Sequence, residues 1–196
     1  MRILHLLTLA ATIAAPIALH ASLLTYTDTF TGSGSIGGVG FNNAVVTFTE
    51  TADPSNKVNE GGGTYAVAGA ATFSIGGVAS GAFTDDIQVF ANQGPGSAGF
   101  GDTSNGAALI LTNAPAFFSY ELGAIAPTDG WTIINSYNNT FLFYGTTVGD
   151  LELNTASDST FSAVDTSAVP EPSSLVLLGT GVLGALGVVR RKFSAV

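Results

Sequence analysis

The chain has 196 residues, a formal net charge of −9 and no cysteine. This length fits one domain or at most two. Because cysteine is missing, the chain has no disulfide framework and no zinc–thiolate site. Residues 22–168 contain thirteen acidic residues and one lysine, but no arginine and no histidine. Such a region repels nucleic acid and lacks the usual nucleophile–base pairs and guanidinium clamps. We therefore expect no nucleic-acid partner, no cofactor and no enzymatic activity.

Residues 1–21 have the pattern of a secretory signal peptide. Arg2 supplies the positive charge at the start, and a mostly apolar stretch follows it. Small residues near position 21 predict cleavage between Ala21 and Ser22. The alternative interpretation is an N-terminal anchor that is not cleaved.

Residues 22–168 predict an all-β domain. Short runs rich in Val, Ile, Phe, Tyr and Thr alternate with Gly, Ser, Thr and Asn turns. In chain order, the strand candidates are Val45–Thr49, Tyr65–Ala68, Ala71–Ile75, Ile87–Phe90, Ala108–Leu111, Phe117–Leu122, Trp131–Ile134, Thr140–Tyr144, Asp150–Leu153 and Thr160–Val164. One helical turn is expected around Ala114–Ala116. The pattern favours a single β-sandwich or flattened barrel of about ten short strands.

The sequence Ser-Ile-Gly-Gly-Val occurs twice, at residues 35–39 and 74–78. A Gly-Gly pair accommodates the positive φ angles of a two-residue hairpin turn. The residues that flank the two copies differ. We therefore interpret them as two similar β-hairpins within one domain, and not as repeats of a solenoid.

The adjacent acidic residues Asp85 and Asp86 are weak candidates for calcium ligands, because Ca²⁺ is bound by carboxylate oxygens. Further ligands would come from Asp53, Glu60 or Asp102. The simpler interpretation is a solvated strand edge whose charges discourage pairing with another sheet. No metal site is assigned on this pattern.

Aromatic residues offer a second candidate site. Trp131, Tyr137 and Tyr144 could form a platform on which sugar rings stack, or they could pack in the core or at a sheet edge.

Threonines offer a third candidate. Thr47, Thr49 and Thr51 alternate along one predicted strand and could present a flat face to ice or a glycan. Threonine is also an ordinary residue on the surface of a strand.

The C-terminal segment predicts a membrane helix over residues 174–189. Leu175–Val189 contains no charge and is followed by Arg190, Arg191 and Lys192. As a helix this apolar stretch would be about 22 Å long, shorter than the roughly 30 Å hydrocarbon core of a bilayer. The basic cluster predicts a cytoplasmic end, with the β domain on the other side of the membrane.

A short motif, Pro170-Glu171-Pro172, stands before this helix. Its two prolines block helix propagation and hold the segment extended, where a processing enzyme could read it. Together with the apolar run and the basic end, residues 169–193 resemble a PEP-CTERM sorting domain, a tail that is also labelled the C-terminal domain of ice-binding proteins. The resemblance implies export, recognition by an exosortase, membrane attachment through the helix during processing, and delivery to the surface or extracellular matrix.

We therefore expect an exported, non-enzymatic surface or extracellular-matrix protein, with exopolysaccharide as a candidate partner. The alternative is a secreted carbohydrate- or calcium-binding β-sandwich module that carries the same sorting tail.

Overall fold

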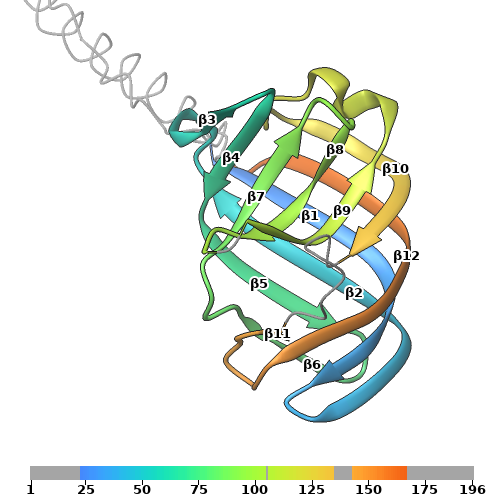
Figure 1. Cartoon of the computed structure of the whole chain (residues 1–196). Helices are drawn as coiled ribbons and strands as arrows, with labels where there is room; N and C mark the ends of the chain where they lie inside the picture. Colours follow the sequence, from blue (N-terminus) through green and yellow to red (C-terminus); the bar gives the residue numbers. More distant parts are fainter. Residues whose placement is uncertain (1–22, 105, 135–142, 167–196) are drawn as a thin grey trace, which may run out of the picture.

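The computed structural model describes residues 23–104, 106–134 and 143–166 (Figure 1). The predicted signal peptide with its Ala21–Ser22 bond, the Pro170–Pro172 motif, the apolar helix and the basic end all lie outside these residues. Within the described ranges, no helix is both long and apolar enough to cross a membrane.

The described part of the chain is all-β, as predicted, with two short 3₁₀ helices. The elements are β1 (Leu24–Ile36), β2 (Val39–Ala52), η1 (Pro54–Asn56), β3 (Val58–Gly61), β4 (Thr64–Ala68), β5 (Ala70–Ile75), β6 (Ala79–Ala82), β7 (Ile87–Asn92), β8 (Ser97–Asp102), β9 (Ala107–Asn113), η2 (Pro115–Ser119), β10 (Ile125–Ile134), β11 (Phe143–Tyr144) and β12 (Leu151–Asp165).

All of these strands belong to one antiparallel sheet in the order β3-β4-β7-β8-β9-β10-β12-β1-β2-β5-β6, with β11 paired to β12. The sheet curls into a half-barrel, so that its two halves face each other across the core (Figure 1). This arrangement confirms the all-β prediction. The strands form one continuous sheet that curls, and not the two separate sheets of a sandwich.

Strand β10 makes the bend, because its two halves have different partners. Ile125–Gly130 pairs with β12, whereas Trp131–Ile134 pairs with β9. Gly130 stands at the change of partner, where a Cβ atom would lie only 2.4 Å from the carbonyl oxygen of Asn113. Only glycine allows the backbones to approach so closely at this corner.

The prediction of about ten strands is close to the number found, but the prediction that all of them are short is wrong. The described residues form twelve strands, and β1, β2 and β12 have 13, 14 and 15 residues. The candidates Asp150–Leu153 and Thr160–Val164 are parts of β12. That strand continues through a bulge at Asp158–Ser159, opposite Phe30 of β1, where Asp158 has a φ of +56°.

The β1–β2 hairpin has the predicted two-residue turn, with Gly37 and Gly38 at φ angles of +54° and +81°. The hairpin between β5 and β6 differs. Ile75 pairs with Ala79, so three residues form its turn, and of its two glycines only Gly77 has a positive φ. The prediction of a second two-residue turn is therefore wrong.

The segment Phe117–Leu122 is not a strand, contrary to the prediction. Pro115 begins the 3₁₀ helix η2, since its fixed φ and missing N–H suit the start of a helix. Phe117 then points into the core. The single helical turn expected around Ala114–Ala116 is confirmed, and it extends to Ser119.

Aromatic rings fill much of the core. Phe48 packs edge-on against Phe30, Phe83 and Phe100, with ring centroids 5.2–5.9 Å apart. A second group surrounds Phe161: its members are Tyr26, Phe117 and Tyr120. Because these rings come from both halves of the sheet, their packing holds the half-barrel closed.

Candidate functional site

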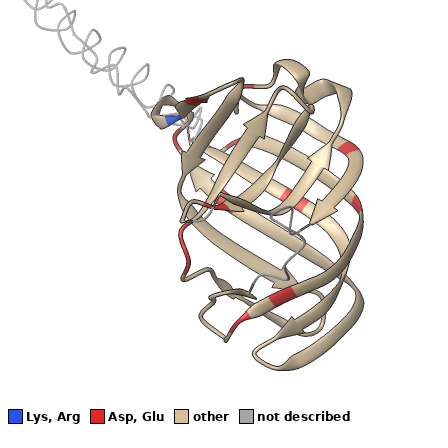
Figure 2. Cartoon of the chain, viewed as in Figure 1, with Lys and Arg blue, Asp and Glu red and all other residues tan. Residues whose placement is uncertain are grey.

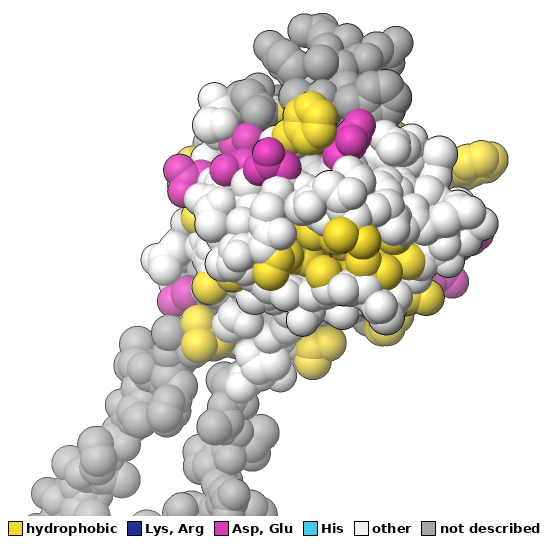
Figure 3. Space-filling model, turned by 90° about the horizontal axis from the view of Figure 1, so that it is seen from below, with side chains coloured by type: hydrophobic (Ala, Val, Ile, Leu, Met, Phe, Trp, Pro, Cys, Tyr) yellow, Lys and Arg dark blue, Asp and Glu magenta, His cyan; other side chains and the backbone are white. Residues whose placement is uncertain are grey.

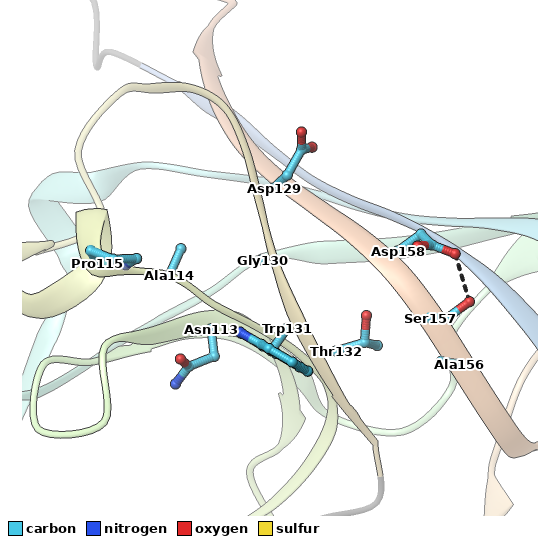
Figure 4. Close-up of a pocket in the computed structure, with 10 residues that line it drawn as sticks. All are labelled: Asn113, Ala114, Pro115, Asp129, Gly130, Trp131, Thr132, Ala156, Ser157 and Asp158. Carbon is cyan, nitrogen blue, oxygen red and sulfur yellow. Dashed lines mark hydrogen bonds between the residues drawn. The ribbon is translucent and has the colours of Figure 1, made fainter.

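A shallow groove lies on the outer surface at the β10 bend (Figure 4). Its volume is about 620 Å³. The residues that line it come from the end of β9, the middle of β10 and the bulge of β12: Asn113, Ala114, Pro115, Asp129, Gly130, Trp131, Thr132, Ala156, Ser157 and Asp158. The groove therefore exists because the sheet bends at Gly130 and β12 bulges beside it.

Trp131 is the dominant side chain of this groove, and 83% of its surface is exposed. In Figure 4 its indole ring lies between Asn113 and Thr132, with Asp129 farther along β10 and Asp158 on β12. An exposed indole beside amide, hydroxyl and carboxylate groups can stack on an apolar ring face and bind the hydroxyls at the ring edge. This is the chemistry of a carbohydrate subsite.

Hydrogen bonds fix the floor of the groove. The Ser159 backbone N–H donates to Oγ1 of Thr132 at 3.0 Å, and the Thr132 hydroxyl donates to Oγ of Ser159 at 3.0 Å. At the rim, the Ser157 hydroxyl donates to Oδ2 of Asp158 at 2.8 Å. These bonds tie β10 to β12 and hold the bulge, so the groove is built from rigid strands.

The predicted aromatic platform is wrong in its membership. Tyr144 is fully buried, and burial raises the pKa of its hydroxyl, so it cannot share a surface with exposed Trp131. Tyr137 lies outside the described residues. The competing interpretation, packing in the core or at a sheet edge, is correct for Tyr144, whereas Trp131 does not pack in the core.

The threonine prediction is extended by the structure. Thr47, Thr49 and Thr51 all point outward from β2, because alternate residues of a strand face opposite sides. The outward residues of β12, β1 and β5 are also mostly Thr and Ser. We call this surface the hydroxyl face; its outward residues are Thr160, Ser162, Val164, Thr25, Thr27, Thr29, Thr47, Thr49, Thr51, Ala70, Thr72 and Ser74.

Strand register aligns these residues in rows across the sheet. The row nearest the groove, here called the hydroxyl row, crosses six strands and consists of Asp129, Thr160, Thr29, Thr47, Ser74 and Ser80. The Thr160 hydroxyl donates to Oδ1 of Asp129 at 2.5 Å, and the hydroxyls of Thr29 and Thr47 are 3.4 Å apart. Asp129 belongs to both the groove and the row, so the two surfaces are continuous.

The adjacent acids Asp85 and Asp86 do not form a metal cluster with other residues. Oδ2 of Asp85 accepts a hydrogen bond from the Gly145 N–H at 2.7 Å, which ties the loop before β7 to the segment after β11. Asp86 is exposed. In the described ranges, no group of three or more acidic or histidine side chains is placed to hold a metal ion.

Two of the other calcium candidates accept hydrogen bonds from nearby backbone N–H groups, and the third lies on a strand. Asp53 caps η1, where hydrogen bonds from the side chain and from the backbone N–H of Ser55 lower the pKa of its carboxyl. Oδ1 of Asp102 accepts from the Ser104 N–H at 2.7 Å, at the end of β8. Glu60 is exposed on β3.

Sequence reasoning missed two carboxyl groups in the core. Asp28 of β1 and Glu50 of β2 are both fully buried. The Thr112 hydroxyl of β9 donates to both oxygens of Asp28 at 3.2 Å. Burial raises the pKa of Asp28 well above its ordinary value, and the bond from Thr112 partly offsets this.

Glu50 has no hydrogen-bond partner of ordinary geometry for either carboxyl oxygen. Burial raises its pKa from 4.5 to about 8, and a weaker contact with the Val89 backbone lowers it slightly. The sequence signal for both acids is their spacing. Each stands two residues from an aromatic residue that points inward on the same strand, Phe30 for Asp28 and Phe48 for Glu50.

Exposed apolar side chains gather on another surface, at the end of the molecule seen in Figure 3. Val39, Val45, Val78 and Val148 belong to the β1–β2 hairpin, the β5–β6 turn and the segment before β12. This patch offers apolar contact alone. The Trp131 groove combines an aromatic ring with several polar groups, so it is the better candidate for a ligand site.

Comparison with known families matches residues 168–192 to the PEP-CTERM protein-sorting motif. The predicted resemblance over residues 169–193 is thereby confirmed. The motif implies an exported protein that an exosortase recognises and that is processed at the membrane. No curated protein and no solved structure matches the chain.

Proposed function

From the sorting motif at residues 168–192, we propose that this is a non-enzymatic protein that exosortase processing delivers to the cell surface or the extracellular matrix. The N-terminal 21 residues act as the signal peptide, and the apolar helix holds the chain in the membrane until the tail is removed. The observation that carries the proposal is the motif, which stands at the end of an all-β domain.

The chemistry of the domain supports a role other than catalysis. Between residues 22 and 168 the chain has no histidine, cysteine or arginine, so the side chains that most often serve as general base, nucleophile or anion clamp are missing. The two carboxyls with raised pKa values, Asp28 and Glu50, are buried in the core and do not line the Trp131 groove.

Charge supports a role outside the cell. Figure 2 shows a basic segment among many acidic ones, and it is the one basic residue of the described ranges. That segment is Lys57, whose amine pairs with Oε2 of Glu121 at 3.1 Å and also donates to the Glu121 carbonyl oxygen at 3.0 Å. The exposed carboxylates therefore keep the domain soluble and dispersed.

A Glu171→Ala variant tests the delivery proposal in a host that contains an exosortase. We expect the variant to stay in the membrane fraction at the mass of the signal-cleaved, full-length chain, whereas the wild type loses its tail. Glu60→Ala, which removes an exposed carboxylate of the domain, is the matched control and should be processed like the wild type. Identical masses for the wild type and the Glu171→Ala variant would contradict the proposal.

A second function, carbohydrate binding, is favoured by one observation: the exposed indole of Trp131 in a groove with Asn113, Asp129 and Asp158. A glycan array probed with purified protein, with and without a calcium chelator, tests it. We expect binding that Trp131→Ala abolishes and that the chelator leaves unchanged. If the wild type binds no glycan, carbohydrate binding is excluded while the delivery proposal stands.

A further inference from the structure

We propose that the ligand is one extended chain of an uncharged polysaccharide, which begins on Trp131 and runs across the sheet along the hydroxyl row. This inference rests on the carbohydrate-binding function proposed above and adds the class of polymer, its direction and its contacts. The next three paragraphs give the grounds in geometry, chemistry and charge.

The geometry provides a continuous path. Asp129 lines the groove with Trp131 and is also the first residue of the hydroxyl row. From Asp129 the row crosses to Thr160, Thr29, Thr47 and onward to β5 and β6 by direct cross-strand pairing. Five steps of about 4.8 Å make the path roughly 24 Å long. That length accommodates several sugar units beyond the one on the indole.

The chemistry of the path changes along its length. At Trp131, an indole face can cover the apolar face of a sugar ring. At Asp129, one carboxylate oxygen accepts from Thr160, which leaves the other to accept from a sugar hydroxyl. Beyond it, each Thr or Ser hydroxyl can both donate and accept, as sugar hydroxyls do. The tryptophan therefore anchors the polymer and the row adds weaker contacts along it.

Charge selects a neutral polymer. From Thr160 to Ser80 the row carries no charge, although the described part of the chain contains thirteen acidic residues. An anionic polymer would meet Asp129 and Asp158 at the groove and would be repelled. A cationic polymer would find no carboxylate on the row beyond Asp129. An uncharged polysaccharide chain is not repelled at the groove and needs no carboxylate partner along the row.

Titration calorimetry of the purified protein with hydroxyethyl cellulose, a neutral polymer, and with cellobiose, a disaccharide, tests the path. The row variant Thr29→Val/Thr47→Val removes two hydroxyls and keeps the β-branched shape. Thr25→Val/Thr51→Val is its control, because this pair also joins β1 to β2 on the same face, with hydroxyls 3.3 Å apart, but two rows away. Both variants must melt at the wild-type temperature.

We expect the row variant to lower affinity for the polymer by about three- to tenfold, the loss of one or two neutral hydrogen bonds. Its affinity for cellobiose should be unchanged, since that ligand occupies only the groove. The control should bind both like the wild type, and Trp131→Ala should abolish binding of both. Carboxymethyl cellulose, which is anionic, should bind more weakly than the neutral polymer.

Three results would overturn the inference in distinguishable ways. Equal losses of polymer affinity in the row and control variants would show that the polysaccharide binds across the whole hydroxyl face, and not along a single row. A row variant that binds like the wild type would show that the groove acts alone, and the carbohydrate function would survive. Inhibition of ice recrystallisation without polysaccharide binding would show that ice occupies the face, and both carbohydrate proposals would fail.

Discussion

Glu50 lies directly opposite Tyr26 in the β1–β2 ladder, and both side chains point into the core. The Tyr26 hydroxyl donates to the Leu122 carbonyl oxygen at 2.7 Å, so it is already engaged. The carboxyl of Glu50 is left without an ordinary hydrogen bond, and it keeps its proton up to a pH of about 8. The fold therefore tolerates this side chain mainly in its neutral form.

Stability should consequently fall as the pH rises from about 4.5 to about 8. In this window the folded chain keeps the Glu50 proton while the unfolded chain has lost it, so each pH unit removes about 1.4 kcal/mol from the free energy of unfolding. We expect Glu50→Gln to be more stable than the wild type at pH 8 and to depend less on pH. Urea unfolding at pH 4, 6 and 8 measures this, with exposed Glu60→Gln as the control. A steeper pH dependence in Glu50→Gln would refute the prediction.

Thr112→Val should destabilise the domain by about 1–3 kcal/mol, because it leaves buried Asp28 without its hydroxyl donor. This destabilisation should increase with pH, since removal of the hydrogen bond from Thr112 raises the pKa of Asp28 further. Denaturant midpoints at two pH values measure it. Thr27→Val, an outward residue of β1, makes the same chemical change and should lie within about 0.5 kcal/mol of the wild type. Equal effects of the two variants would count against the prediction.

Gly130→Ala should destabilise the domain by about 1–3 kcal/mol, since the new methyl group would overlap the carbonyl oxygen of Asn113. The damage should concentrate at the β10 bend, and hydrogen exchange of the Trp131–Ile134 amides should accelerate. Gly123→Ala is the control, because its Cβ meets no atom within 4 Å. Equal melting temperatures of Gly130→Ala and Gly123→Ala would contradict the close approach of Gly130 to the Asn113 carbonyl oxygen.

Trp131 is the only tryptophan in the chain, so its fluorescence reports on the groove alone. Because 83% of the side chain is exposed, we expect red-shifted emission from the folded protein and efficient quenching by acrylamide. Unfolding in urea should change the emission maximum little. Trp131→Ala should leave the melting temperature within about 1 °C of the wild type, the small effect expected at an exposed position. Blue-shifted native emission would mean that the indole is buried.

Much of the fold could be predicted from alternation along single strands. The candidates within β2, β4, β5, β7, β9 and β10 coincide with strands of the structure. The aromatic-rich segment Phe117–Leu122 was wrongly predicted as a strand, because Pro115 starts a helical turn that aromatic content alone does not reveal. The residues of β1 before Ser35 were not among the strand candidates, although Thr and buried residues alternate along them.

The candidate site could be predicted only in parts. Thr47 and Trp131 were both singled out, but their relation depends on register. Asp129 pairs with Thr160, Thr160 with Thr29, and Thr29 with Thr47, across strands that are distant in the sequence. No local pattern specifies such pairing. The inward positions of Asp28 and Glu50, by contrast, follow from a period of two and could have been found.

The pairing of β1 with β12 has a mechanical consequence. The Thr166 N–H donates to the Leu23 carbonyl oxygen at 2.9 Å, so the first and last described residues lie at neighbouring points of the sheet. A pull between these two points would open the β1–β12 ladder one bond at a time. A pull between residue 166 and a polymer held on Trp131 would instead run along β12 and load many bonds at once. Force spectroscopy in the two geometries should therefore show a weak and a strong direction, and the strong one lies between the sorting tail and the groove.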